Sequence, residues 1–355
     1  ETGKRNRMKI ALLTDTHFGA RGDSLVFFDY MMEFYDNVFF PYLSENNITT
    51  MIHLGDVVDR RKFINFNILH GMRSRFIERL QNEKIESHVI IGNHDTYFKN
   101  TNDINSMNEL IDFNHEYAPN VYSDPVTLNF DGRDICIMPW INSGNFTKCK
   151  NHIKKTEAKV LFGHLEISGF EMNKGVKCED GLDIKMFSGF DLVCSGHFHH
   201  KSNNGSIHYL GNPYELTWID YNDPRGFHIY DTDTNELEFI QNPYRMFHKI
   251  YYDEEKLSQL NYSTYTGKYV KVIVKNKTKQ HLLDNLIDDL YNHDVVDVSV
   301  IDDSYEFEGM DETQSIEDTM SLLSTYIDDY NLDLDKNRLK GLIQDLYVTA
   351  LREPA

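Results

Sequence analysis

The chain has 355 residues, of which 40% are hydrophobic, so it can build one large domain with a substantial core and one or two smaller domains. No run of eighteen apolar residues occurs, so a membrane-spanning helix is not expected. The net charge of −20 by itself disfavours a nucleic-acid partner, but 17 of the 56 acidic residues fall in residues 284–335, which contain no Lys or Arg. The remaining 39 nearly balance the 36 basic residues, so the rest of the chain is not excluded from binding nucleic acid.

The first residues and the cysteines indicate the compartment. Residues 1–7, ETGKRNR, lack the apolar centre of a signal peptide, and we expect them to be a tag or a short basic lead. None of the four cysteines, Cys136, Cys149, Cys178 and Cys194, forms a CxxC pair. We therefore interpret them as free thiols in a reducing, cytoplasmic environment.

Short apolar strands alternate with longer amphipathic stretches in the first part of the chain. Strands are predicted at residues 8–15, 49–56 and 87–95, and helices at 24–43 and 63–82. This alternation indicates α/β layers.

Later strand candidates follow one another more closely and indicate a second, more antiparallel sheet. They lie at residues 133–140, 158–166, 190–199, 206–213 and 226–233.

A domain boundary is expected near residues 245–268. A strand at 269–276, a helix at about 279–293 and a strand at 295–304 would then form a small βαβ unit.

A polar, acidic linker at residues 305–314 precedes two amphipathic helices at about 315–330 and 335–352. Their apolar residues recur at helical spacing: Ile316, Met320, Leu323 and Ile327, then Leu339, Leu342, Ile343, Leu346 and Tyr347. The two stripes could pack on each other as a plain hairpin. We favour binding in a groove of a partner, because the linker separates the helices from the body.

Polar residues recur where the predicted strands end, and the carboxyl edge of an α/β sheet is where ligands gather. The five motifs are Asp15-x-His17, Gly55-Asp56-x-x-Asp59, Gly92-Asn93-His94-Asp95, Gly163-His164 and Gly196-His197-x-His199. Any one of them is weak evidence, because a single histidine is more often a hydrogen-bonded core or surface residue. The ordered set is much more specific, because every member follows an apolar strand and supplies oxygen or nitrogen donors.

These donor types predict a class of metal. Carboxylate, imidazole and amide oxygen suit Mn²⁺, Fe²⁺, Zn²⁺ or Mg²⁺, and the motifs contain no thiolate to favour a softer ion. Two ions would need about eight donor positions, and one carboxylate can bridge them.

In this order the motifs resemble the signature of the calcineurin-like metallophosphoesterase superfamily over about residues 8–240. The resemblance implies an α/β fold with a two-sheet αββα sandwich, a small α+β capping domain and C-terminal helices. It also implies two metal sites that share Asp56. One ion would be held by Asp15, His17, Asp56 and His199, and the other by Asp56, Asn93, His164 and His197.

The resemblance gives two further residues catalytic roles. His94 matches the family's non-ligand histidine, which donates a proton or stabilises the transition state, and Asp59 would orient it. A carboxylate beside an imidazole fixes its tautomer and favours its protonated form, which suits a general acid.

Four cations near the motifs are candidates for DNA contact: Arg60, Arg61, Lys62 and Lys99. Arg60, Arg61 and Lys62 follow Asp59 directly and could contact phosphates that flank the scissile one. A solvated loop that leads into a helix is about as good an interpretation of these three.

The stretch YLGNPYELTWIDYNDPRGFHIYD (209–231), with the small βαβ cap, the linker and the terminal helices after it, resembles the SbcD branch, the meiotic-recombination-11 type of DNA repair nuclease. Within this branch, the chain resembles the recombination-endonuclease subunits of large tailed bacteriophages. The implied domains are 8–245 for the nuclease, 246–304 for the cap and 315–355 for helical docking to an ATPase.

This resemblance implies a Mn²⁺-dependent exonuclease and endonuclease acting on duplex ends and single strands, with Mg²⁺ as the second possible metal. The partner would be an SMC-like ABC ATPase of the SbcC type, contacted by Ile316, Met320, Leu323, Leu342 and Leu346. No G-x-x-x-x-G-K-[ST] occurs here, so the ATPase must be another chain.

A homodimer through helices near 63–82 and 105–113 is implied as well, with no membrane partner. If a phage encodes the protein, its location would be the cytoplasm of the bacterial host.

Two other functions compete with this one. A phosphomonoesterase acting on proteins or nucleotides is suggested by GDVVDRR and GNHD, but protein phosphatases carry a glycine where Arg61 stands and a glutamate where Asp95 stands. A scaffold with an inactive site ranks last, because none of the implied ligands is missing.

Overall fold

The computed structural model describes residues 8–173 and 175–302. The predicted lead at 1–7, the acidic linker at 305–314 and the docking helices within 315–355 lie outside the described residues. The described chain divides into two compact units. The first runs to Glu215 and resumes over Asn222–Tyr244, and the second comprises Leu216–Tyr221 and the residues from Arg245 onwards. Among the described residues, no helix has both the length and the apolar character needed to cross a membrane.

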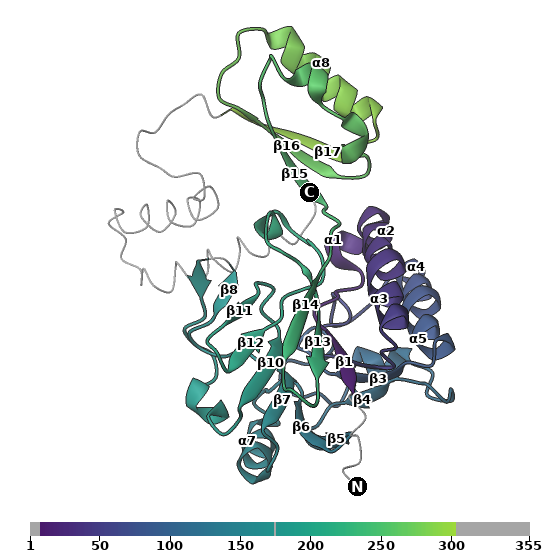
Figure 1. Cartoon of the computed structure of the whole chain (residues 1–355), viewed down its shortest axis with the longest axis vertical. Coiled ribbons are helices and arrows are strands. Elements are labelled where there is room, and N and C mark those ends of the chain that lie inside the picture. The colour runs from purple at the N-terminus through teal and green to yellow at the C-terminus, as the bar shows by residue number, and fades with distance from the viewer. Residues whose placement is uncertain (1–7, 174, 303–355) are drawn as a thin grey trace. The chain divides into compact units, whose positions relative to one another are not determined.

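The first unit contains two six-stranded sheets (Figure 1). The first sheet has the order β14-β13-β1-β2-β3-β4, in which β1 to β4 are parallel, while β13 is antiparallel to both β1 and β14. Its strands are β1 (Lys9–Leu13), β2 (Thr50–His53), β3 (Glu86–Ile90), β4 (Asn120–Tyr122), β13 (Gly226–Asp231) and β14 (Leu237–Gln241).

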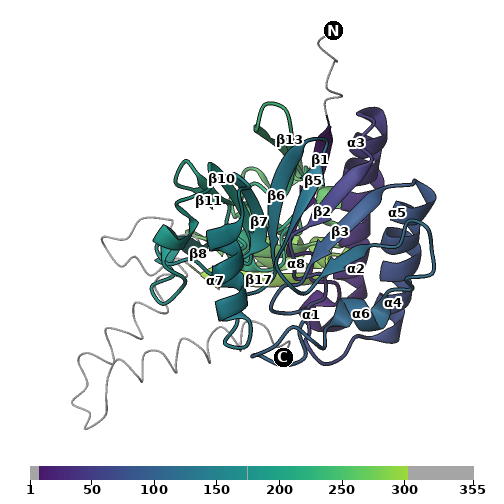
Figure 2. The ribbon, with the colours of Figure 1, turned by 90° about the horizontal axis from the view of Figure 1, so that it is seen from below.

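Helices cover the outer face of this sheet (Figure 2). They are α1 (Ala20–Asp23), α2 (Leu25–Phe34), α3 (Phe40–Glu45), α4 (Phe66–Met72), α5 (Glu78–Asn82) and α6 (Ser106–Leu110). An aromatic cluster packs beneath them, in which the Tyr35 ring lies 4.9 Å from Phe76 and 5.9 Å from Phe18. The long apolar stretches of the sequence thus bury aromatic rings against the sheet.

The two predicted long helices are present but are interrupted. The first is α2 and α3 joined by a π-helical turn at Tyr35–Phe39, and the second is α4 and α5 joined by a π-helical turn at Arg73–Ile77. The second helix begins at Phe66 and not at residue 63, because the Asn65 side chain accepts a hydrogen bond from the Asn67 N–H at 2.8 Å and caps the helix.

The second sheet has the order β11-β12-β10-β7-β6-β5. Its strands are β5 (Val126–Phe130), β6 (Arg133–Met138), β7 (Val160–His164), β10 (Leu192–Gly196), β11 (Ser202–Asn203) and β12 (Ile207–Tyr209). Helix α7 (Phe146–Lys155) covers its outer face (Figure 2), and a 3₁₀ turn lies at Ile184–Phe187. The 3₁₀ turn at Trp218–Asp220 belongs to the second unit. A short hairpin of β8 (Glu171–Asn173) and β9 (Val176–Lys177) is separate from both sheets.

The prediction of a more antiparallel second sheet was wrong. Strands β6, β7, β10 and β12 are parallel, and only the edge strands β5 and β11 run antiparallel to their neighbours. Strand β13, which was expected in the second sheet, pairs with β1 in the first. Crossovers such as α7 between β6 and β7 supply the connections that parallel neighbours need.

The inner faces of the two sheets share one apolar core, which includes Ile10 and Ile52 from the first sheet and Ile137 and Phe162 from the second. Layers therefore run helices, sheet, sheet, helix, and the predicted αββα sandwich is confirmed (Figure 2).

Within its described residues, the second unit is a parallel three-stranded sheet with one α-helix. Strands β15 (Phe247–Tyr251), β16 (Tyr269–Val274) and β17 (Asp297–Asp302) have the order β15-β16-β17, and α8 (Gln280–Asn292) packs Leu283, Leu286 and Leu290 against them. Short 3₁₀ turns lie at Leu257–Gln259 and Tyr262–Tyr265. The βαβ order of β16, α8 and β17 matches the sequence-based expectation, whereas β15 was missed because FHKIY is too short to stand out from the sequence around it.

Candidate metal centre

The motif residues lie just after, or at the last residue of, parallel strands. β1 ends two residues before Asp15, β2 ends three residues before Asp56, and β3 ends three residues before Asn93. In the second sheet, His164 is the last residue of β7, and His197 follows β10 directly. The carboxyl edges of the two sheets thus bring these side chains together within the first unit.

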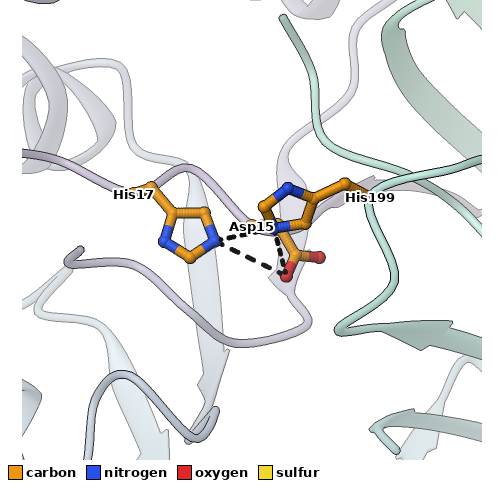
Figure 3. Close-up of side chains that lie close together, drawn as sticks. All are labelled: Asp15, His17 and His199. Carbon is orange, nitrogen blue, oxygen red and sulfur yellow. Dashed lines mark hydrogen bonds and ion pairs between the residues drawn. The ribbon is translucent and has the colours of Figure 1, made fainter. Parts of the chain in front are cut away.

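Asp15, His17 and His199 form one group, which we call the first cluster (Figure 3). His17 Nε2 lies 3.0 Å from His199 Nε2, and each of these nitrogens lies 3.9 Å from Asp15 Oδ1. The three ligand atoms converge on one point, although 182 residues of chain separate the two histidines.

Asp56, His164 and His197 form the second cluster, to which Asn93 adds an amide oxygen. His164 Nε2 lies 3.3 Å from Asp56 Oδ2 and 3.0 Å from Asn93 Oδ1, and His197 Nδ1 lies 2.9 Å from the same Asn93 oxygen. One carboxylate, one amide oxygen and two imidazoles therefore face each other.

Asp56 joins the two clusters. Its Oδ2 atom lies 3.3 Å from His164 Nε2 in the second cluster and 3.9 Å from His17 Nε2 in the first. The carboxylate is buried, so its charge acts on both groups with little screening by solvent.

Four of the cluster residues have a left-handed backbone, which is uncommon for residues other than glycine. The φ angles are 51° for Asp15, 45° for His17, 55° for Asp56 and 86° for His197. Such conformations cost free energy and persist only where the surroundings impose them. Here the Asp15 N–H donates to the Gly55 carbonyl at 3.0 Å, and the His17 N–H donates to the Asp56 carbonyl at 3.1 Å.

Asp95 holds the loop that carries Asp56. Its fully buried carboxylate accepts the backbone N–H groups of Asp56 at 2.8 Å, Val57 at 2.9 Å and Gly92 at 2.9 Å. Burial, together with the charge of Asp56, raises the pKa of Asp95 to about 6. Asp95 is the last residue of the GNHD motif, and this positioning role was not predicted from the sequence.

The space beside Asp56 requires glycine at position 92. A Cβ atom on Gly92 would collide with the Asp56 side chain and backbone nitrogen. The carboxylate can therefore reach its place only because residue 92 has no side chain.

His94 lies beside the clusters and contacts Asp59 and Asp56. Its Nδ1 atom is 2.5 Å from the Asp59 backbone carbonyl, and its N–H donates to Asp56 Oδ1 at 2.7 Å. The Asp59 carboxylate lies 3.4 Å from Nδ1 of His17. The contact between Asp59 and His94 thus uses the main chain, where we had expected the carboxylate.

The electrostatics of the clusters depend on Asp56. Burial alone would raise the pKa of Asp56, but the charges of His164 and His94 lower it well below the ordinary value. Burial lowers the pKa of His164, but the charge and hydrogen bond of Asp56, together with the Asp15 charge and the hydrogen bond to the Leu54 carbonyl, raise it to about 9. Burial lowers the pKa of His199 well below its ordinary range, and the charge of His17 adds to the effect.

This donor set fits divalent cations. The Nε2 atoms of His17 and His199 face each other at 3.0 Å, and the low pKa of His199 keeps its ring neutral, with a lone pair for a metal. Among the described residues, the candidate groups contain only aspartate and histidine, which suits Mn²⁺, Fe²⁺, Zn²⁺ or Mg²⁺ more than softer ions.

Trp140 forms part of the wall of the second cluster and was not singled out from the sequence. Its ring lies 4.9 Å from that of His197 and 6.0 Å from that of His164. The Trp140 carbonyl accepts from the Asn102 and Asn145 side chains at 2.9 Å each, which anchors the segment.

The predicted basic residues have different surroundings. Arg60 forms an ion pair with Asp23 at 2.9 Å. Arg61 is half-buried, and its Nη1 atom is buried without a hydrogen-bond partner among the described residues. Burial lowers the pKa of Arg61, although the charge of Asp56 opposes this. Lys62 and Lys99 are exposed.

The fold and these clusters define a metal-dependent phosphoesterase of the two-sheet type. The calcineurin-like phosphoesterase family model matches residues 8–201, which is more than half of the chain. The chain therefore belongs to the calcineurin-like phosphoesterase family.

Two curated relatives are nucleases. The chain is 34% identical over 352 residues to exonuclease subunit 1 of Enterobacteria phage T4, a match that covers 97% of this chain and 99% of that protein. It is 28% identical over 92 residues to a subunit of the SbcCD nuclease of Staphylococcus epidermidis, covering 24% of this chain and 25% of that protein. A solved structure described as a novel archaeal phosphodiesterase matches with a TM-score of 0.33 and 16% identity over 66% of this chain and 100% of that one, too low to add to the assignment.

Proposed function

We propose that this protein is a two-metal phosphodiesterase and the nuclease subunit of a DNA double-strand-break repair and recombination complex, with exonuclease and endonuclease activity. The observation that carries the proposal is the position of Asp56, whose Oδ2 atom faces both histidine clusters. The phage relative, an exonuclease subunit matched over 99% of its length, supports a nucleic acid as the substrate.

The proposed ligands are the residues of the two clusters. One divalent ion would be held by Asp15, His17, Asp56 and His199, and the other by Asp56, Asn93, His164 and His197. We propose Mn²⁺ as the native ion, with Mg²⁺ as the second possibility. When bound, a pair of such ions lowers the pKa of water and neutralises charge on the phosphoryl oxygens.

His94 is the proposed proton donor to the leaving oxygen. Its Nδ1 atom contacts the Asp59 carbonyl at 2.5 Å, so Nδ1 carries a hydrogen. Donation would use a second proton on Nε2; burial lowers the pKa of the ring and disfavours that proton, whereas the charges of Asp56 and Asp59 favour it. Asp59 thus supports the tautomer through its main chain, and its carboxylate holds His17.

DNA contact is proposed for Arg60, Arg61, Lys62 and Lys99. Arg61 has the strongest support, because an arginine nitrogen that is buried without a partner is costly until an anion pairs with it. Each phosphate contact would add affinity that falls with salt.

We propose an SMC-like ABC ATPase of the SbcC type as the partner. The proposed domains are residues 8–245 for the nuclease, 246–304 for the cap and 315–355 for docking, and the residues proposed to contact the ATPase are Ile316, Met320, Leu323, Leu342 and Leu346. The relation to a component of an SbcCD nuclease supports this partnership. The host cytoplasm is the proposed location, in keeping with the phage relative.

A homodimer through the region of α4, α5 and α6 is part of the proposal. Phe66 at the start of α4 is 86% exposed, and Phe113 after α6 is 49% exposed, so apolar surface is available there. Light scattering of a Phe66→Glu variant tests it: a monomer where the wild type is a dimer supports the interface, and an unchanged mass contradicts it.

The central experiment compares substrates in Mn²⁺. We expect the protein to degrade duplex DNA with free ends and to hydrolyse a small phosphodiester, while a phosphomonoester reacts slowly. A phosphomonoesterase, the competing function, would release phosphate from the monoester and leave DNA intact.

Deleting residues 315–355 should abolish binding to the ATPase and spare basal cleavage. A truncated protein that still binds the ATPase contradicts the docking proposal.

A further inference from the structure

Two large aromatic side chains stand exposed directly after the GNHD motif, which carries the proposed ligand Asn93. Tyr97 is 39% exposed and Phe98 is 47% exposed, and their rings lie 4.7 Å apart in an edge-to-face arrangement. Phe63, on the segment that follows Asp59, is 64% exposed. Large apolar side chains that gather at a protein surface usually mark a binding site.

Cations accompany these rings. The Lys62 Nζ atom lies 5.5 Å from the centroid of the Tyr97 ring, and the Arg60 guanidinium lies 5.0 Å from that of Phe63. Arg60 also pairs with Asp23, whereas Lys62 forms no ion pair among the residues that the structure describes. The surface therefore combines flat apolar faces with positive charge, which suits a ligand that is aromatic and anionic at once.

The aromatic segment is held in place by its neighbours. The Tyr97 N–H donates to the Ile104 carbonyl at 2.9 Å, and the Thr96 hydroxyl donates to the Asn93 carbonyl at 3.1 Å. Just before it, Asp95 is tied to the loop of Asp56. The rings are thus exposed on an anchored backbone, which limits the entropy lost on binding.

The distance from these rings to the metal ligands is limited by the chain itself. Tyr97 is four residues after Asn93, a proposed ligand. Four residues span at most about 14 Å between Cα atoms, which is about four base-pair rises along the axis of a DNA duplex. A strand with a phosphate at the clusters can therefore reach Tyr97 within a few nucleotides.

We propose that Tyr97, Phe98 and Phe63 form a stacking platform for unpaired nucleobases of the strand whose phosphate lies at the metal centre. The proposal rests on the proposed nuclease function and deepens it, because it assigns the recognition of unpaired bases to these three rings. Bases stack on exposed aromatic rings whatever their sequence, and Lys62 lies where it can pair with the strand's phosphates. Paired bases inside a duplex have no free faces to offer.

The test compares two single strands of the same length, oligo(dT) and an abasic strand with the same phosphates. Binding is measured by fluorescence anisotropy with His94→Ala as the background, so that no cleavage interferes. Adding Tyr97→Ala and Phe98→Ala should weaken oligo(dT) binding about 5- to 100-fold. Binding of the abasic strand should change little, because that strand has no bases to lose.

Conservative and distant changes serve as controls. Tyr97→Trp with Phe98→Tyr should keep oligo(dT) affinity within about threefold of the parent, since each ring is replaced by a ring. Tyr291→Ala, which removes a half-exposed tyrosine from α8 in the second unit, should have no effect.

Two outcomes overturn the proposal. The first is that Tyr97→Ala with Phe98→Ala weakens binding of oligo(dT) and of the abasic strand equally. The second is that light scattering finds half the wild-type mass for this variant, which would mean that the rings pack between two copies of the chain. Hydrolysis of a small phosphodiester without nucleobases separates this proposal from the proposed function. Tyr97→Ala with Phe98→Ala should leave that hydrolysis unchanged. If the wild type does not hydrolyse the diester, the nuclease function fails by itself, whatever the strands show.

Discussion

The buried carboxylate of Asp95 accepts the backbone N–H of Asp56 at 2.8 Å, and so places a residue whose carboxylate faces both metal-ligand clusters. The same carboxylate also accepts the N–H groups of Val57 and Gly92, so it joins the loop after β2 to the loop after β3. Asp95 is therefore a positioning residue, which acts on a ligand through the main chain.

Replacing Asp95 by asparagine should weaken divalent-metal binding about 10- to 100-fold. The asparagine amide keeps one acceptor oxygen, but its NH₂ group would face the backbone N–H groups that the second carboxylate oxygen now accepts, so the loop that carries Asp56 would shift. Trp140 is a convenient reporter, since its ring lies 4.9 Å from His197 and the chain has only two tryptophans. In a Trp218→Phe background, Mn²⁺ quenching of the remaining fluorescence gives the affinity.

Asp103→Asn is the matched control, because Asp103 is exposed in the same loop. If the Asp95 and Asp103 variants bind metal equally well, the positioning role of Asp95 is wrong.

Replacing His94 by alanine should lower the rate of DNA cleavage about 10²- to 10⁴-fold and leave metal binding intact. The physical reason is that the His94 ring contacts the Asp59 carbonyl and lies outside the two proposed ligand sets. Calorimetry with Mn²⁺ measures the number of bound ions, and cleavage of an end-labelled duplex measures the rate.

His115→Ala, which removes an exposed histidine, should match the wild type in both measurements. Loss of both ions from the His94 variant would instead make His94 a ligand.

Metal affinity should rise with pH. The pKa of His164 lies at about 9, so without metal the ring holds a proton at neutral pH, and a cation must displace that proton to use Nε2. Below pH 9 this group therefore makes affinity increase with pH, by up to about tenfold per pH unit. Calorimetry in two buffers with different ionisation enthalpies measures the protons released.

The variant His164→Gln should flatten this dependence and release fewer protons. A wild-type affinity for Mn²⁺ that is constant between pH 6.5 and 8.5 would contradict this prediction.

Arg61→Gln should weaken duplex DNA binding most at low salt and reduce the salt slope of the binding constant by about 0.9 for the phosphate contact that is lost. The Nη1 atom of Arg61 is buried without a partner among the described residues, so a phosphate would satisfy it. Filter binding at several salt concentrations gives the slope.

Lys159→Gln also removes one positive charge, but from a residue just before β7, at the end of the sheet away from the clusters. Equal slopes for both variants would mean that Arg61 contributes only to net charge.

Much of this architecture could be predicted because its signals are local. Apolar runs of strand length that end in Asp15, Asp56, Asn93, His164 and His197 are visible in the chain without any tertiary contact. The helical periodicity of 24–43 and 63–82 is equally local, although it does not reveal the π-helical turns at Tyr35–Phe39 and Arg73–Ile77.

Other features depend on partners distant in the chain. The parallel order of β6, β7 and β10 was not predicted, because strand direction follows from the crossovers and leaves no mark on a short apolar strand. Likewise, only the fold shows that the Asp59 carboxylate contacts His17 and that the Asp59 backbone carbonyl contacts His94. The sequence does not distinguish these contacts from the reverse pairing.

The sequence by itself determined which donors this protein offers and where along the chain they stand, because strand periodicity and motif spacing are properties of neighbouring residues. Only the tertiary structure decided which donors meet, and that Asp95 sets the position of Asp56. The reason is physical: His17 and His199 are 182 residues apart, and their nitrogens come within 3.0 Å only because two sheets pack with their carboxyl edges on the same side.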